Sequence, residues 1–168
     1  MKWSNALIAA AGLLLATSAT QAKQVMCVFD LVGKNGDVFT LMKDYQLAAK
    51  NWGADLELKV NSNESVIAED FKAGKCDAVS ITGMRGRQFN SFTRSLDAIG
   101  AIPDLNLAVK VMQGLANPNF AKYMTSGKYE VVGVIPVGDA FLMVNDRNIN
   151  TVAKAAGKKM AVLDYDQA

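Results

Sequence analysis

Three polar loops, each following an apolar segment, hold the side chains best suited to grip a small molecule. The loops begin at Asp30, Asn61 and Thr82. Guanidinium groups pair with carboxylates through two parallel hydrogen bonds, and the third loop supplies arginines for this purpose. The candidate ligand-binding residues are therefore Asp30, Asn61, Thr82, Arg85, Arg87 and Gln88. Taken singly, each arginine is more typical of a solvated surface charge than of a ligand contact.

Composition excludes several kinds of chemistry. The 168 residues include no histidine and two cysteines, so histidine-based catalysis, histidine-ligated zinc and a four-cysteine zinc site are excluded. Phosphate-binding and nucleophile-elbow motifs are also missing. Asp164 and Asp166 flank one tyrosine, which is more typical of two solvated carboxylates than of a metal site. We predict no enzyme activity, no cofactor and no metal.

The charge balance argues against nucleic acid as a partner. The chain has 18 lysines and arginines against 16 acidic residues, without the clustered basic excess of a nucleic-acid-binding protein. A 51% hydrophobic content is that of a globular protein. The length allows one domain and hardly two.

The elements that must position the three loops alternate between strand and helix. Apolar patterning predicts strands at 25–31, 56–60 and 76–81, with helices at 38–52 and at about 66–73 between them. Asp37 is the expected cap of the first helix. Ser62 with Ser65, or Asn63 with Val66, is expected to cap the second. Short connections in this order predict an α/β fold with a mainly parallel sheet, whose strands end at one edge and bring the loops together.

The rest of the chain is less regular. Residues 82–94 are expected to form a polar loop, and Asp104 is expected to cap a helix over 105–115. Further predictions are a short helix from Pro118 to Met124, strands at 129–135, 140–144 and 160–163, and a helix at 152–156.

Two regions bear on the cellular compartment. Residues 1–22 have a charged start, a short apolar run and small residues before a cleavage point, which predicts a secretory signal peptide and a mature chain without a transmembrane segment. Export favours oxidation, so Cys27 and Cys76 are candidates for a disulfide between neighbouring strands. Two buried thiols remain the alternative.

Several segments together resemble a known family. They are VMCVFDLVGKNGD (25–37), AEDFKAGKCDAVSITGMRGRQFNSF (68–92) and GKKMAVLDYD (157–166). The chain resembles the exported, DctP-like solute-binding proteins of TRAP-type transporters. The closest likeness is to a divergent branch, some of whose members carry the label of RND-type efflux components involved in aminoglycoside resistance.

The resemblance implies a type II periplasmic binding fold, with a solute held between two lobes and delivered to membrane transporter subunits. Residues 23–136 would form the first lobe, and 137–168 a hinge strand and the incomplete start of the second, in a family roughly twice as long. Ordinary members carry a ligand-clamping arginine where this chain has Ala161, so Lys159 or Arg85 would have to replace it. The alternative role is that of an accessory periplasmic protein in drug efflux, which is not itself a pump.

Overall fold

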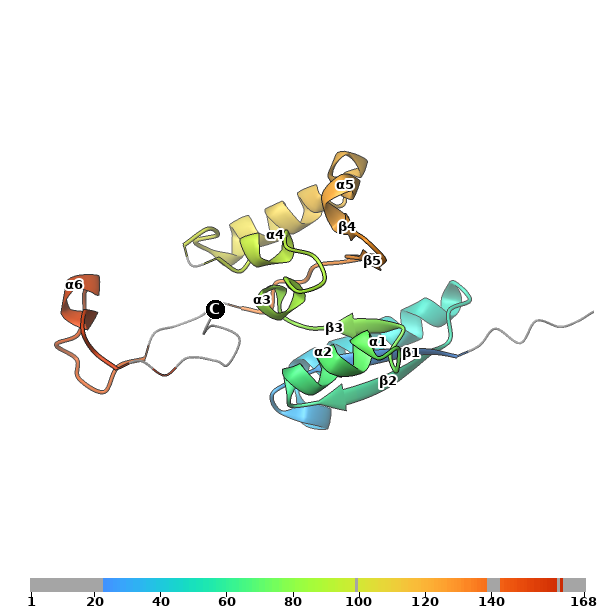
Figure 1. Cartoon of the computed structure of the whole chain (residues 1–168), viewed down its shortest axis with the longest axis horizontal. Coiled ribbons are helices and arrows are strands. Elements are labelled where there is room, and N and C mark those ends of the chain that lie inside the picture. Colours follow the sequence, from blue (N-terminus) through green and yellow to red (C-terminus); the bar gives the residue numbers. More distant parts are fainter. Residues whose placement is uncertain (1–22, 99, 139–142, 160, 162–168) are drawn as a thin grey trace, which may run out of the picture.

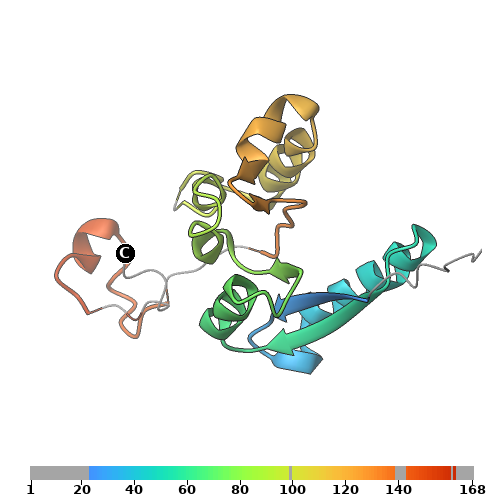
Figure 2. The same cartoon turned by 45° about the vertical axis from the view of Figure 1, so that its right-hand side comes forward.

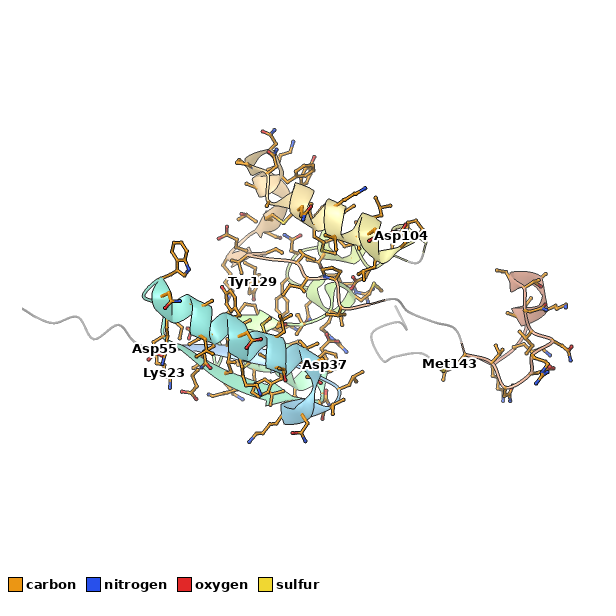
Figure 3. The ribbon with its side chains drawn as sticks, turned by 180° about the vertical axis from the view of Figure 1, so that it is seen from behind. Lys23, Asp37, Asp55, Asp104, Tyr129 and Met143 are labelled. Atoms are coloured by element: carbon orange, nitrogen blue, oxygen red, sulfur yellow. A yellow bond between two sulfur atoms is a disulfide. The ribbon has the colours of Figure 1, made fainter. Side chains whose placement is uncertain are left out.

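A three-stranded parallel sheet forms the centre of the structure. The computed structural model describes residues 23–98, 100–138, 143–159 and 161. β1 (Gln24–Phe29) lies between β2 (Leu56–Asn61) and β3 (Ala78–Ser80), in the order β2-β1-β3. α1 (Asp37–Asn51) and α2 (Glu64–Lys72) cover opposite faces of this sheet (Figure 1, Figure 3). The predicted strand–helix alternation and its parallel sheet are confirmed.

A disulfide lies in the core between the sheet and α2. Cys27 and Cys76 are bonded, with Cα atoms 5.9 Å apart, and both are at least 95% buried. Ile67 on α2 completes this core cluster, and partly buried side chains from β1, α2 and the β3 region pack around it. The structure therefore selects the disulfide over the two free thiols.

The strand predicted at 76–81 is shorter than expected, because Asp77 interrupts the ladder. Val25 on β1 donates its amide to the Asp77 carboxylate at 2.7 Å, and its carbonyl accepts the Asp77 amide at 2.8 Å. A side chain thus replaces a backbone partner at this position. Cys76 consequently lies before β3, and the β1 register pairs Cys27 with Val79 instead.

Beyond β3 the chain builds a second, mainly helical layer. Its elements are α3 (Gly83–Gly86), η2 (Thr93–Ser95), α4 (Leu105–Leu115), η3 (Pro118–Phe120), α5 (Ala121–Met124), β4 (Thr125–Ser126) and β5 (Tyr129–Glu130). Figure 1 shows α4 and α5 on the far side of α3 from the sheet. α6 (Val152–Ala155) lies apart from both layers in Figure 1 and Figure 2. Within the described residues, no helix has the length and apolarity needed to cross a membrane.

Capping explains where two of the predicted helices begin. The Asn63 side chain accepts from the amides of Ser65 and Val66, so the second of the two proposed caps is the correct one. Asp104 accepts from Leu107, and α4 has its predicted bounds. Figure 3 labels Asp104 at the start of α4.

The strand predicted at 129–135 is wrong beyond Glu130. Among the described residues β5 pairs with β4 alone, across a turn at Gly127, where φ is +57°. Residues 131–138 have no regular structure, since a strand persists only where a neighbour pairs with its backbone. The helix predicted at 152–156 is confirmed as α6. Most residues of the strands predicted at 140–144 and 160–163 lie outside the described residues, and the described ones, 143, 144 and 161, are not in a strand.

Candidate functional site

The three predicted loops meet at the carboxyl edge of the sheet. β1 is the central strand, so Asp30 lies between Asn61, which ends β2, and Thr82, which follows β3. The Asp30 amide donates to the Asn61 carbonyl at 3.2 Å, which ties the first two loops together. In open α/β sheets this edge is where ligands bind.

The Asp30 carboxylate organises the first loop. It is 5% exposed, and its two oxygens accept from the amides of Val32 and Phe39, each at 2.9 Å. Phe39 lies in the first turn of α1, so Asp30 performs the capping that the sequence suggested for Asp37. Asp37 is the first helical residue instead, and that prediction is wrong. An acidic side chain from a neighbouring loop satisfies the helix amides equally well.

Gly36 leaves the space that the Asp30 carboxylate fills. A Cβ at this position would overlap the carboxylate, although the backbone of Gly36, at φ −83°, is one that any residue adopts. We expect Gly36→Ala to lower the free energy of unfolding by about 2 kcal/mol through overpacking. Urea denaturation measures this change.

Gly114→Ala is the matched control, because Gly114 lies in the last turn of α4 and a Cβ added there would have no contact within 4 Å outside its own helix backbone and chain neighbours. Alanine there is expected to stabilise the protein by roughly 0.5–1 kcal/mol through helix propensity. Equal effects of the two substitutions would contradict the packing described for Asp30.

The side chains of Asn61 and Thr82 also accept hydrogen bonds from backbone amides. The Asn61 side chain accepts from the Asn63 amide at 2.8 Å, closing the turn into α2. The Thr82 hydroxyl accepts from the Arg85 amide at 3.1 Å and so caps α3. The predicted loop at 82–94 is therefore wrong over Gly83–Gly86 and Thr93–Ser95, where short helical turns form.

Glu64 is the site residue that the sequence-based selection missed. Its side chain is 3% exposed; one carboxylate oxygen accepts from the Thr82 amide at 2.6 Å, and the other lies 3.5 Å from Nε of Arg85. Glu64 thus fastens the second loop to the third. Its position directly after the Asn63 cap, beside a strand end, was the available signal, because acidic groups are favoured in the first turn of a helix.

The two arginines differ in their surroundings. The Arg85 side chain is 17% exposed and its charge is paired with Glu64. Arg87 is half-buried at the end of α3, and its guanidinium forms no ion pair with any residue that the structure describes. Gln88 is exposed and donates from its side-chain amide to the Arg85 carbonyl at 3.0 Å.

Packing against its neighbours holds α3 in place. The Thr93 hydroxyl donates toward the Gly83 carbonyl at 2.7 Å, and the Asp97 carboxylate accepts from the Met84 amide at 2.9 Å. Phe89 packs edge-on against Phe71 and Tyr129, with centroids 5.1 and 4.9 Å away. Phe89 is therefore a packing residue. Tyr129, labelled in Figure 3, joins the β4–β5 hairpin to α2.

The side chains at the carboxyl edge offer hydrogen-bond donors and acceptors. Across the described residues, no cluster of three metal-ligating side chains occurs. Glu64 and Arg85 neutralise one another, and Arg87, two residues further along the chain, carries a positive charge that pairs with no acidic residue that the structure describes. Such an arrangement can hold a polar molecule by hydrogen bonds and charge.

The protein has a parallel α/β layer, and its three polar loops lie at the carboxyl edge of the sheet. Sheets of this class bind ligands at that edge. More particularly, residues 46–168 match the family model described as "Solute-binding protein AdeT 1/2", and the chain belongs to this family.

Two curated relatives come from Acinetobacter baumannii. The chain is 55% identical over 141 residues to the probable solute-binding protein AdeT1, covering 84% of this chain and 46% of the relative. It is 36% identical over 69 residues to the probable solute-binding protein AdeT2, covering 41% and 29%. The matched regions thus span less than half of either relative. No solved structure matches significantly.

Proposed function

We propose that this chain is the N-terminal part of a periplasmic solute-binding component of a TRAP-like transport system. It captures a small polar solute in a cleft between two lobes and changes no covalent bond. The observation that carries the proposal is the carboxyl edge of the sheet. There, Thr82 caps the short helix α3 after β3, Arg85 lies on α3 and Arg87 directly follows it. Membership of a solute-binding family supports it.

The proposal assigns residues 1–22 to a cleaved signal peptide, 23–136 to the first lobe, and 137–168 to a hinge strand and the start of the second lobe. Hinge closure around the solute is the motion such an architecture performs. Delivery to membrane transporter subunits follows closure. The relatives, which are more than twice as long as their matched regions, leave room for a second lobe.

The six candidate residues take two roles in this proposal. Asp30, Asn61 and Thr82 shape the loops, because their oxygens accept backbone amides. Arg85, Arg87 and Gln88 supply side-chain donors toward the solute. Arg87 is the principal charged contact, because Glu64 already balances Arg85.

A thermal-shift screen tests the function. Tm is measured with organic acids, amino acids and aminoglycosides for two proteins. The first is this chain, and the second is this chain joined to the part of the AdeT1 relative that it does not match. A true solute at a hundred times its Kd stabilises by about 2.7 kcal/mol, which raises Tm by roughly 5–10 °C. Arg87→Gln is expected to abolish the shift.

Arg94→Gln, which removes an exposed arginine from the same stretch of chain, is the control and is expected to keep the shift. If no class stabilises either protein, the solute-binding proposal fails. A response confined to aminoglycosides would favour the alternative role as an accessory protein of drug efflux.

A further inference from the structure

The first polar loop contains the dipeptide Asn35-Gly36, and no other asparagine of the chain precedes a glycine. An asparagine side chain reacts most readily with the backbone amide of the next residue when that residue is glycine, because no Cβ hinders the approach. The dipeptide lies where η1 (Gly33–Asn35) meets α1, next to Asp37, which Figure 3 labels at the start of α1. The loop therefore holds the asparagine whose sequence context favours reaction most.

The Asn35 side chain is exposed, and its amide forms no hydrogen bond with any residue that the structure describes. Other asparagines of the chain are held, because their side-chain oxygens accept backbone amides in turns and helix caps. They include Asn61, Asn63, Asn90 and Asn117. The fold restrains these side chains and leaves that of Asn35 able to rotate toward the backbone.

The fold restrains the attacking nitrogen instead. The Gly36 amide donates to the Gly33 carbonyl at 3.1 Å, and Gly36 is buried against the Asp30 carboxylate. The amide must leave this hydrogen bond before it can attack the Asn35 side chain. A single 3-10 turn is a weak restraint, because its hydrogen-bond geometry is poor and short segments open far more often than a whole domain unfolds. The reaction is therefore slow in the closed loop and faster in the open one.

We propose that Asn35 is a site of spontaneous deamidation, and that the contact between Gly36 and Asp30 sets its rate. In the open loop the Gly36 nitrogen attacks Cγ of Asn35 and closes a cyclic succinimide. The Cγ–Nδ2 bond breaks, and the side-chain nitrogen leaves as ammonia with the proton of the Gly36 amide. Water then opens the ring at either carbonyl, which yields aspartate or isoaspartate. Water is the only co-reactant, so this inference goes beyond the proposed function and requires no solute.

The two products differ in their effect on the first loop. Each adds a negative charge to the loop that Asp30 organises. Aspartate keeps the backbone intact, and a carboxylate beside the first turn of α1 is favourable. Isoaspartate continues the chain through its side chain and inserts an extra backbone carbon before Gly36. Because Gly36 packs against Asp30, this insertion is expected to displace the carboxylate that accepts the Phe39 amide.

Prolonged incubation of the purified chain at mildly alkaline pH tests the proposal. Peptide mapping by mass spectrometry follows each asparagine, and an isoaspartate-specific methyltransferase labels the branched product. Asn35 is expected to deamidate faster than every other asparagine of the folded chain, and about tenfold faster again in urea, where the turn is open. Asn35→Gln is the control, because its longer side chain closes a ring far less readily, and its fragment is expected to stay unmodified.

Asp30→Ala tests the role of the contact. Without the carboxylate Gly36 loses its packing partner, so deamidation of Asn35 is expected to accelerate about tenfold. Asp30→Asn, which keeps the shape of the side chain, is expected to accelerate it less. Glu64→Ala is the matched control, because it removes a buried carboxylate that contacts the third loop and not the first. It is expected to change the rate by less than about twofold.

The isoaspartate form provides a second readout. Separated from the incubated protein by ion exchange, it is expected to have a Tm at least about 3 °C below that of the unmodified chain. Asn35→Asp carries the same added charge on an intact backbone, and its Tm is expected to stay within about 1 °C of the unmodified value.

Four results would overturn the proposal. The first is an intact Asn35 in the folded chain after a time that converts this residue completely in urea. The second is faster deamidation of another asparagine, and the third is an equal rate at Asn35 with and without the Asp30 carboxylate. The fourth is an isoaspartate form as stable as the unmodified chain. None of these measurements involves a solute, so this proposal and the solute-binding proposal fail separately.

Discussion

Replacing both Cys27 and Cys76 with alanine is expected to lower the free energy of unfolding by about 4 kcal/mol. The two residues are 49 positions apart, and a crosslink over a loop of that length removes much of the conformational freedom of the unfolded chain. The bond also lies in the core against Ile67, where it joins β1 to the segment before β3. Denaturant unfolding of both proteins, with and without reductant, measures the loss.

Reductant supplies the internal control for the disulfide. It should shift the unfolding midpoint of the unmodified protein toward that of the double variant and leave the variant unchanged. A midpoint that is insensitive to reductant in the unmodified protein would contradict the disulfide. Loss of this much stability is a large fraction of the 5–15 kcal/mol that holds most domains folded.

Glu64→Ala is expected to lower the free energy of unfolding by about 3 kcal/mol, because it removes the buried carboxylate that pairs with the Arg85 guanidinium. The Thr82 amide loses its acceptor in the same substitution, so the second and third loops are no longer fastened together. Urea denaturation measures the change. Glu64→Gln keeps an acceptor for Thr82 and should cost less.

Glu69→Ala is the control on the same helix. Glu69 pairs with Lys72 at 2.8 Å, but the two side chains are 70% and 42% exposed, so water screens the charges. The expected loss is below about 0.5 kcal/mol. Comparable losses from Glu64→Ala and Glu69→Ala would show that the Glu64–Arg85 pair does not hold the edge together.

Local signals predicted the parts of the fold that local physics controls. The bounds of α4 follow from the Asp104 cap and from apolar residues at helical spacing. The ends of α1 and α2 follow from Gly53 and Gly74, whose φ values of +83° and +73° favour glycine. Alternation of strands and helices predicted the parallel sheet, since short crossovers allow few other arrangements.

Predictions failed where a distant residue substituted for a local one. Asp30, seven residues before Asp37, caps α1. Asp77 replaces a backbone partner of β1 and shortens β3. Residues 131–135 have strand-forming side chains, but pairing depends on a neighbour that sequence patterning does not reveal. The Glu64–Arg85 pair joins two loops 21 positions apart and was missed for the same reason.

By itself, the sequence determined the class of fold and the edge at which the three polar loops meet. These depend on residue type and on spacing within one element. Only the tertiary structure decided that Cys27 and Cys76 are bonded and that the Asp30 and Glu64 carboxylates accept hydrogen bonds that connect the loops. It also decided that Arg85 pairs with Glu64, whereas Arg87 forms no ion pair with a described residue. The physical reason is that each of these depends on which groups from distant segments share a buried space, where an unpaired charge or amide is costly.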